Sequence, residues 1–373
     1  MRIAQIAPLV ESVPPRSYGG TERIVSYLTE ELVQMGHQVT LFASGDSVTS
    51  AELAPCAQAA FRLNKAVRDP AIYYMLMLDQ LRRRANEFDI FHFHIDYYHF
   101  PVFRALAQRT VTTLHGRQDL PDLRPLYHGF NEMPLVSISN HQRLPIAHAN
   151  FAGTILHGIP ADRLEPIFEP RGGYVAFLGR FSPEKGPDRA IEIARALGVR
   201  LKLAAKIDAV DQEYFERTVQ PMLQHPGIEF IGEINEREKS AFLGEAQALL
   251  FPIDWPEPFG LVMIEAMACG TPVLAFRCGA VEEIIDDGVT GRIVDTMEEA
   301  IAALPEVISL DRRAVRRRFE ERFTARRMAK DYVNLYRAQL QGAERAIPEA
   351  EETTLGPEPG ADSHQGGRRP YVG

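Results

Sequence analysis

Residues 255–273 read WPEPFGLVMIEAMACGTPV, and they follow the apolar run ALLFPI of residues 248–253. The run predicts a strand, and the almost continuously apolar segment 261–269 predicts a buried helix after it. Two prolines restrict the connecting loop, and Gly260 lets the backbone come close to a ligand. Because ligands bind at the carboxyl ends of strands in doubly wound sheets, this strand–loop–helix unit is a candidate binding edge.

Two carboxylates belong to this unit. Glu265 lies in the middle of the apolar helix, where a carboxylate needs hydrogen-bonding or cationic partners. Glu257 lies eight positions earlier, in the loop that enters the helix. The free amides at the helix start therefore lie between two carboxylates, an arrangement that suits a polyhydroxylated, partly anionic ligand. The alternative is that Glu265 pairs with a core Arg or Lys and that Glu257 is a solvated loop residue.

The rest of the chain alternates strand and helix patterns in two halves. In the first half a helix is expected from its N-cap Thr21 to Gly36, and strands are expected at 2–7, 38–43, 90–94, 111–114 and 135–139. The segment 166–173 interrupts the pattern, which then restarts with strands at 174–178, 201–205 and 228–231 and helices at 188–197, 212–223 and 236–245. This order predicts an α/β protein of two Rossmann-like, doubly wound domains that face a deep cleft.

The expected domains are residues 1–165 and 166–325, followed by an amphipathic helix at 326–342. Residues 343–373 are rich in Glu, Pro and Gly without apolar periodicity, which predicts a disordered tail. A formal net charge of −9 argues against general nucleic-acid binding. Three cysteines without metal-ligand spacing are typical of a reducing compartment.

The N-terminus predicts a strand and not a signal peptide, and no run approaches the roughly 20 apolar residues of a membrane span. We therefore expect a cytoplasmic protein. The basic segments 82–84 and 312–318 could give weak peripheral contact with anionic lipid at the inner membrane face. Solvated helix faces are the more common explanation of such runs.

Two loops carry anion-binding features. The loop GRFSPEKG at 179–186 follows a predicted strand and holds Arg180 and Lys185. An Arg fork and a mobile Lys charge suit a diphosphate, and they could neutralise a departing phosphate without a metal ion. Before the first helix, Gly19 and Gly20 would let backbone N–H groups approach an anion. The alternatives are a solvated basic loop and a flexible turn.

Histidines are concentrated in the first half of the chain. His115 in TLHG and His157 in ILHGIP each precede a glycine, and His115 directly follows a predicted strand. Both are candidates for contact with a ligand in the cleft, whereas His92 and His94 are weaker ones. A neutral histidine with backbone partners is the alternative for each. The absence of HExxH, GxGxxG and GxxxxGK[ST] weakens metalloenzyme, dinucleotide dehydrogenase and P-loop hypotheses.

The two α/β halves, the early GG loop, TLHG, GRFSPEKG and EPFGLVMIEAMACGTPV together resemble family 4 of the retaining glycosyltransferases, which adopt the GT-B fold. The resemblance extends over roughly residues 1–340. It implies a nucleotide diphosphate sugar as co-substrate, no metal or other cofactor, and a C-terminal helix that packs back on the N-terminal domain. The transferred unit would be a hexose-like sugar, passed with retained configuration to a hydroxyl of an acceptor. A glycan, a lipid-linked molecule and a small molecule all remain open as acceptor.

The resemblance also implies roles for individual residues. Arg180 and Lys185 would hold the donor diphosphate with backbone help from Gly19 and Gly20. Glu257 would bind hydroxyls of the transferred sugar, and Glu265 would bind the ribose hydroxyls of the nucleotide. His115 would lie beside the reacting sugar carbon. Phe259, Gly260 and Leu261 would provide backbone amides to the sugar or the phosphate. Two further candidates, His157 and Lys206, lie where the chain departs from the usual family pattern. A nucleotide-sugar epimerase, a sugar phosphorylase of the same fold and a non-catalytic nucleotide-sugar-binding protein are the alternatives.

Overall fold

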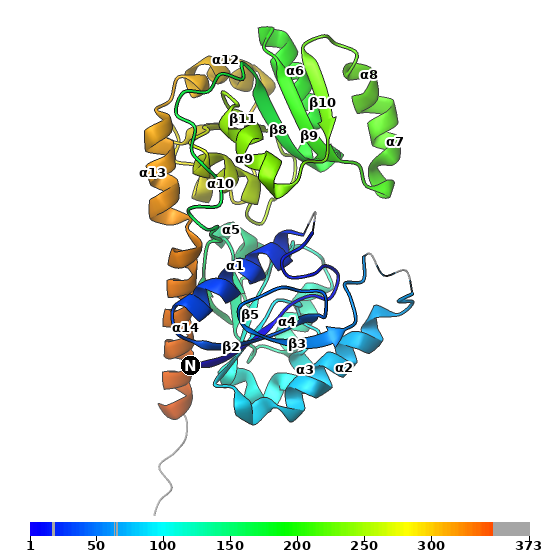
Figure 1. The fold of residues 1–373 in the computed structure, drawn as a ribbon, viewed down its shortest axis with the longest axis vertical. Helices are drawn as coiled ribbons and strands as arrows, with labels where there is room; N and C mark the ends of the chain where they lie inside the picture. Colours follow the sequence, from blue (N-terminus) through cyan, green and yellow to red (C-terminus); the bar gives the residue numbers. More distant parts are fainter. Residues whose placement is uncertain (17–18, 63, 65, 346–373) are drawn as a thin grey trace, which may run out of the picture.

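The computed structural model describes residues 1–16, 19–62, 64 and 66–345. Two parallel sheets, each flanked by helices, form two lobes that lie one above the other (Figure 1). The sheets confirm the predicted α/β architecture. The sequence predicts a disordered tail at 343–373. Residues 343–345 of this segment belong to the last helix, and residues 346–373 lie outside the described residues.

The first lobe is built on a seven-stranded sheet of order β3-β2-β1-β4-β5-β6-β7. Its strands are β1 (Arg2–Ile6), β2 (Gln38–Ser44), β3 (Glu52–Ala57), β4 (Ile90–Phe93), β5 (Thr110–Thr113), β6 (Leu135–Ser137) and β7 (Phe151–Thr154). Its helices are α1 (Gly20–Gln34), α2 (Pro70–Arg83), α3 (Phe100–Phe103), α4 (Leu123–Gly129) and α5 (Asn140–Arg143), with 3-10 turns η1 (Ala85–Glu87), η2 (Arg104–Arg109) and η3 (Leu144–Ile146).

The second lobe is built on a six-stranded sheet of order β10-β9-β8-β11-β12-β13. Its strands are β8 (Val175–Arg180), β9 (Leu201–Lys206), β10 (Ile228–Gly232), β11 (Leu249–Phe251), β12 (Val273–Phe276) and β13 (Gly291–Val294). Its helices are α6 (Pro187–Leu197), α7 (Gln212–Tyr214), α8 (Gln220–Met222), α9 (Glu236–Gly244), α10 (Leu261–Ala268), α11 (Val281–Ile284), α12 (Met297–Ile308) and α13 (Arg312–Arg322), with η4 (Pro183–Lys185), η5 (Ala209–Asp211) and the π-helical η6 (Phe215–Val219).

Both sheets reverse their strand order at one point, between β1 and β4 and between β8 and β11. Ligands bind at such switch points, outside the carboxyl ends of the strands. The loops that leave β8 and β11 are the two that carry GRFSPEKG and WPEPFG. The topology therefore brings the two most informative motifs of the second lobe to one edge of its sheet.

Helix α10 is buried in the core of the second lobe, as its apolar sequence predicts. Met263, Ile264 and Met267 have no exposed surface and pack in one cluster with strands on either side. Burial of each such side chain contributes about 1.5–3 kcal/mol. The helix is therefore fixed firmly enough to hold the loop before it in place.

The last helix, α14 (Ala325–Arg345), returns to the first lobe and runs alongside it (Figure 1). Its buried residues Met328, Tyr332 and Tyr336 pack with Ile3 and Val111 of the first sheet. Arg326 also pairs with Glu31 of α1 at 3.3 Å. A segment more than 300 residues from the N-terminus thus covers one face of the N-terminal sheet.

Two local predictions were wrong. Helix α1 begins at Gly20 and not after Thr21, because the Gly19 carbonyl accepts the hydrogen bond of the Arg23 N–H and makes Gly19 the N-cap. The single helix predicted at 212–223 is divided into α7, the π-helical η6 and α8. Pro221, which has no N–H to donate to the preceding turn, lies two residues after the π-helical segment.

The basic run at 312–318 is only partly a surface feature. Arg312 donates hydrogen bonds to the carbonyls of Ile167 and Gly244 at 2.6 and 2.8 Å, and Arg316 donates to the Ala161 carbonyl at 2.7 Å. Both side chains are largely buried. They tie the segment between the two sheets to the second lobe, which takes these two arginines out of any surface role. Among the described residues, the helices are too short or too polar to cross a membrane.

Candidate active site

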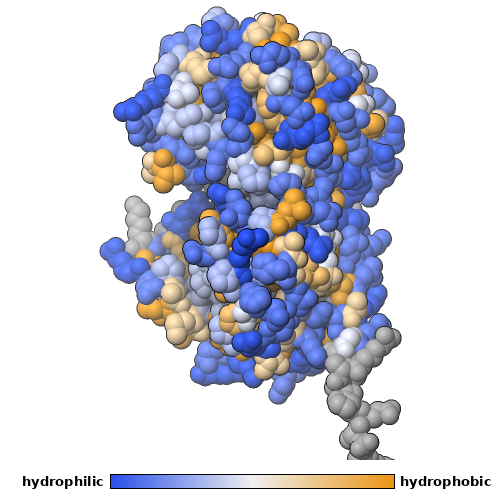
Figure 2. Space-filling view, turned by 180° about the vertical axis from the view of Figure 1, so that it is seen from behind, coloured by the Kyte–Doolittle hydropathy of each residue, from blue (hydrophilic) through white to orange (hydrophobic). Residues whose placement is uncertain are grey.

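A cavity of about 590 Å³ lies between the two lobes. Its walls are formed in the first lobe by the start of α1 and by residues after β5, β6 and β7. In the second lobe they are formed by the ends of β8, β9, β10 and β11 and by α9 and α10. The space-filling surface is hollowed at this level, between the two lobes (Figure 2). The cavity therefore lies where the carboxyl ends of both sheets face one another.

The predicted site residues meet in this cavity. They come from six separate stretches of sequence, and all of them are among its lining residues: Gly19, Gly20, His115, His157, Arg180, Lys185, Lys206, Glu257, Phe259, Gly260, Leu261 and Glu265. His92 and His94, the weaker candidates, lie behind the wall and do not line it. The placement brings the residues together, while the role of each stays a prediction.

Lys185 and Glu257 form an ion pair at the second-lobe wall. Glu257 also accepts a hydrogen bond from the indole nitrogen of Trp255 at 2.9 Å, and the Lys185 ammonium lies 4.9 Å from the centre of that indole. The Glu257 side chain is only 13% exposed, so it is not the solvated loop residue of the alternative. A candidate phosphate cation and a candidate sugar carboxylate thus neutralise each other in this structure.

The backbone of Gly279 fixes this loop from behind. A Cβ atom at this position would lie 2.3 Å from both the backbone nitrogen and the backbone oxygen of Glu257. Gly279 also has a φ of +61°, which L side chains adopt at a cost. The Ala280 N–H, in turn, donates to the Glu257 carbonyl at 2.9 Å. The position of Glu257 therefore depends on a close backbone contact with the loop after β12.

Arg180 and Lys206 lie at the ends of the neighbouring strands β8 and β9, paired in register. The Arg180 guanidinium is 3.5 Å from both Asp208 and Asp211, and the Lys206 ammonium is 2.7 Å from Asp208. The hydrogen bond from Lys206 lowers the pKa of Asp208, although burial acts in the opposite direction. Arg180 and Lys206 thus share two carboxylates, Asp208 and Asp211. These aspartates compete with a phosphate for the two cations, so phosphate binding here depends on how the aspartate side chains are oriented.

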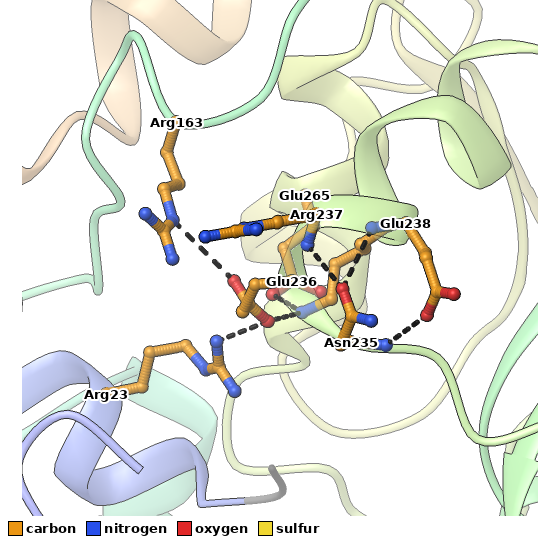
Figure 3. A network of polar contacts seen from close by, with 8 residues as sticks. Arg23, Arg163, Asn235, Glu236, Arg237, Glu238 and Glu265 are labelled. Atoms are coloured by element: carbon orange, nitrogen blue, oxygen red, sulfur yellow. Dashed lines mark hydrogen bonds and ion pairs between the residues drawn. The ribbon is translucent and has the colours of Figure 1, made fainter. Parts of the chain in front are cut away.

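Glu265 belongs to a chain of charges that joins the two lobes (Figure 3). Its Oε1 atom is 2.7 Å from the Lys239 ammonium, which is also 2.6 Å from Glu236. Glu236 pairs in turn with Arg23 of α1, in the first lobe, and lies 3.9 Å from Arg163. Glu265 therefore pairs with a core lysine, Lys239, as the alternative interpretation of the sequence expected.

The charge state of Lys239 follows from this arrangement. Burial disfavours an ammonium ion, but the neighbouring carboxylates of Glu265 and Glu236 outweigh it and raise the pKa of Lys239. The lysine therefore remains charged at neutral pH. Only one oxygen of Glu265 is hydrogen-bonded to it, and the carboxylate still lines the cavity.

The histidines form part of the first-lobe wall. The rings of His115 and His157 are stacked with their centres 5.2 Å apart, and His157 meets the ring of Phe259 edge-on at 4.9 Å. Burial lowers the pKa of His115 to about 3. His115 is therefore neutral at physiological pH and a weak base.

Sequence reasoning missed Lys239, Arg23 and Glu236. Lys239 had a detectable signal, because it lies three and four positions before Phe242 and Leu243 on the predicted helix and so shares their buried face. A lysine on such a face needs a carboxylate partner. Arg23 had no comparable signal, since its partner lies in the other lobe. Within the part of the chain that the structure describes, no group of three or more His, Cys, Asp or Glu side chains could hold a metal ion.

Two family models match the chain, one after the other. The model described as Glycosyltransferase Family 4 covers residues 18–168, and that described as Glycosyl transferases group 1 covers residues 162–326. The chain belongs to the family 4 glycosyltransferases. Each model corresponds to one lobe, so the family 4 glycosyltransferase signature spans both walls of the cavity.

Known proteins similar to this family 4 glycosyltransferase agree with the assignment. A phosphatidyl-myo-inositol mannosyltransferase of Mycobacterium leprae is 26% identical over 86% of this chain and 90% of its own length. Among solved structures, a glycosyltransferase involved in avilamycin A biosynthesis matches 92% of this chain and 98% of its own with a TM-score of 0.71 at 23% identity. Anabaena HepE in complex with UDP-glucose matches 91% of this chain and all of its own with a TM-score of 0.64 at 16% identity. The structural matches show the shared GT-B fold. The chain spans only about a third of the length of several other curated relatives.

Proposed function

We propose that this glycosyltransferase binds a nucleotide diphosphate sugar in the cavity and transfers a hexose-like unit, with retained configuration and without a metal ion, to an acceptor hydroxyl. One observation carries the proposal. The cations, carboxylates and neutral histidine predicted from the sequence all line one cavity between the two lobes: Arg180, Lys185, Glu257, Glu265 and His115. The UDP-glucose complex of a fold neighbour supports a nucleotide sugar as donor, and the mannosyltransferase relative supports transfer of a hexose-like unit.

The diphosphate would bind at the second-lobe wall. Arg180 and Lys185 supply positive charge there, and the backbone of Gly19 and Gly20 faces them across the cavity. As the bond between the sugar and the diphosphate breaks, negative charge develops on the leaving oxygen. Cations already in place stabilise that charge without reorganisation. Lys185 would exchange part of its contact with Glu257 for a phosphate oxygen.

The sugar would lie between Glu257 and His115. Gly260 is the N-cap of α10 and provides no side-chain cap, while the Met263 N–H donates to the Gly260 carbonyl at 3.0 Å. The amides of Leu261 and Val262 would then bind hydroxyl or phosphate oxygens. In the transfer step, the C1–phosphate bond breaks, the C1–acceptor oxygen bond forms, and the acceptor proton passes to the leaving diphosphate. Glu257 would orient the sugar through its hydroxyls. This differs from retaining glycosidases, in which a carboxylate attacks C1.

The ribose would bind at Glu265. One oxygen of this carboxylate is hydrogen-bonded to Lys239, and the other can accept from a ribose hydroxyl. Lys239 would then act as the group that holds Glu265 in a fixed orientation. Closure of the lobes around the donor would exclude water, which otherwise hydrolyses the activated sugar.

An acceptor in a membrane would require contact with lipid, and α2 is the helix that would provide it. Its residues Ile72, Met75 and Leu76 are exposed, and Arg82 and Arg83 lie at its C-terminal end. Cosedimentation with vesicles of anionic lipid tests this contact, and vesicles of neutral lipid are the control. A cytoplasmic location stays a prediction.

The test of the function begins with ligand binding. UDP-, GDP- and ADP-sugars are screened by thermal shift, because a ligand that binds only the folded protein raises its stability by RT ln(1 + [L]/Kd). The donor that binds is then incubated with candidate acceptors in the presence of EDTA, and NMR of the product gives the anomeric configuration. We expect transfer with retention that EDTA does not affect.

Other outcomes would contradict the proposal in distinguishable ways. Conversion of the donor sugar without acceptor would indicate an epimerase, and a requirement for inorganic phosphate would indicate a phosphorylase. Binding without turnover on any acceptor would indicate a non-catalytic protein. If no nucleotide sugar stabilises the chain, the donor assignment itself is wrong.

A further inference from the structure

A continuous chain of hydrogen bonds runs behind the cavity wall and ends at His115. It passes through Gln5 on β1, His94 directly after β4 and Tyr336 on α14, all of them buried. Gln5 is paired in register with His92, and the N–H of His94, directly after β4, donates to the Ile6 carbonyl at 2.9 Å. The C-terminal helix is thus connected through the sheet to a residue of the candidate active site.

The direction of each hydrogen bond in this chain follows from the chemistry of Gln5. Its Oε1 atom is 2.8 Å from Nε2 of His94, and its Nε2 atom is 3.3 Å from both the hydroxyl of Tyr336 and Nδ1 of His92. An amide oxygen can only accept a hydrogen bond, so Nε2 of His94 must carry the proton. A neutral imidazole has a single N–H, and Nδ1 of His94 is therefore an acceptor.

The same reasoning fixes His115. Its Nε2 atom is 2.9 Å from Nδ1 of His94. Since that nitrogen accepts, Nε2 of His115 must donate, and Nδ1 of His115 is left with a free lone pair. Both rings are neutral, because burial lowers the pKa of His94 well below its ordinary value and that of His115 to about 3. His115 lines the cavity, whereas His94 does not.

We propose that Gln5 and His94 are positioning residues that hold His115 as its Nε2–H tautomer, so that His115 offers Nδ1 as a hydrogen-bond acceptor to a hydroxyl of the donor sugar. The sugar contact rests on the proposed function, whereas the tautomer does not. In this state His115 accepts from a hydroxyl and has no proton to donate to the leaving group. A donor sugar without the contacted hydroxyl would bind less tightly, which makes the pair Gln5 and His94 an indirect determinant of sugar selectivity.

The tautomer is measured directly on the full-length protein without ligand. The protein is labelled with [15N]histidine, and long-range 1H–15N correlation spectra distinguish a protonated from an unprotonated ring nitrogen. The His115 signals are identified as those lost in His115→Asn. We expect a protonated Nε2 and an unprotonated Nδ1. A proton on Nδ1 of His115 would overturn the proposal, whatever the enzyme's substrates are.

A variant tests the link from Gln5 to the sugar. Gln5→Met keeps the length of the side chain and removes the oxygen that accepts from His94. We expect loss of the single tautomer at His115 and ~10-fold weaker binding of a nucleotide sugar, about the effect of one lost hydrogen bond. Binding of the matching nucleoside diphosphate should not change, because it lacks the sugar. The pairs compared by calorimetry are UDP-glucose with UDP, GDP-mannose with GDP and ADP-glucose with ADP.

Tyr332→Phe is the matched control. Tyr332 lies on the same helix as Tyr336 and is also buried. Its hydroxyl is 2.8 Å from Thr113, which bonds to His92, so it lies outside the path from Gln5 through His94 to His115. This variant should keep the His115 tautomer and change the affinity for the nucleotide sugar less than about twofold. Equal loss in both variants, or an unchanged tautomer and affinity in a folded Gln5→Met, would overturn the proposal. If none of the three nucleotide sugars binds the wild-type protein, the proposed function and the sugar contact fail, while the spectrum still decides the tautomer.

Discussion

Replacement of Lys239 by methionine tests the charge chain that holds Glu265. The side chains of Lys239 and Glu265 are 11% and 9% exposed, so their ion pair is well removed from water. Removing one partner of a buried pair costs about 3–5 kcal/mol, because the other charge remains buried. We expect the lower end, about 3 kcal/mol. The reason is that Glu236, the other partner of Lys239, keeps its ion pair with Arg23.

Thermal unfolding followed by circular dichroism and calorimetry measures this effect. For a domain of about 150–250 residues, 1 kcal/mol lowers Tm by about 2–4 °C, so we expect Lys239→Met to lower the transition of the second lobe by roughly 6–12 °C. Arg163→Met is the control, since its side chain is 50% exposed and lies 3.9 Å from Glu236. An exposed pair of this kind contributes less than about 1 kcal/mol.

A second variant identifies the orphaned charge as the cause. Glu265→Gln in the background of Lys239→Met removes the unpaired carboxylate, so the double variant should be more stable than Lys239→Met alone. The reasoning is refuted if Lys239→Met lowers Tm no more than Arg163→Met does. It is also refuted if Glu265→Gln adds to the loss, because the two residues would then not be coupled.

Four further predictions concern the site and the core. Lys185→Ala and Glu257→Ala should each lower the rate of sugar transfer by ~100-fold or more with unchanged circular dichroism, as expected for the loss of charge stabilisation or sugar orientation, and wild-type turnover in either would contradict the assigned role. Glu265→Ala should weaken nucleoside diphosphate binding by about tenfold in calorimetry, the effect of one lost hydrogen bond to a charged group, and an unchanged affinity would argue against ribose binding there. Gly279→Ala should displace Glu257 and lower transfer by ~10–100-fold in a folded protein, which a crystal structure of the variant would verify. Burial lowers the pKa of His99 well below its ordinary value, so the unfolded state binds more protons than the folded state below about pH 6.5, and stability should fall as the pH falls from there. His99→Phe should reduce this slope, measured by urea unfolding between pH 5 and 7, by up to about 1.4 kcal/mol per pH unit.

Several elements were predictable because their information is local. Helix α10 is apolar throughout, and α14 repeats buried residues at Met328, Tyr332 and Tyr336 with helical spacing. Strands β3, β7, β12 and β13 were not predicted. In β7 and β13 a glycine occupies one of only four positions, which weakens the apolar pattern of a strand. The start of α1 was misplaced because a backbone hydrogen bond, and not the cap preference of Thr21, decides where the helix begins.

The sequence by itself determined the fold class and many of the residues that line the cavity, but not Arg23, Glu236 and Lys239. Glycines, prolines and charges placed at strand ends specify the binding edge of a parallel sheet, and this information lies within each short segment. Only the tertiary structure decided the partners: Lys185 meets Glu257 across 72 positions, Lys239 meets Glu265 across 26, and His94 meets Gln5 across 89. Periodicity states which face of an element is buried, but not what packs against that face. Charge pairing and histidine protonation depend on distances of a few ångströms between elements, and those distances arise only when the sheets and helices are assembled.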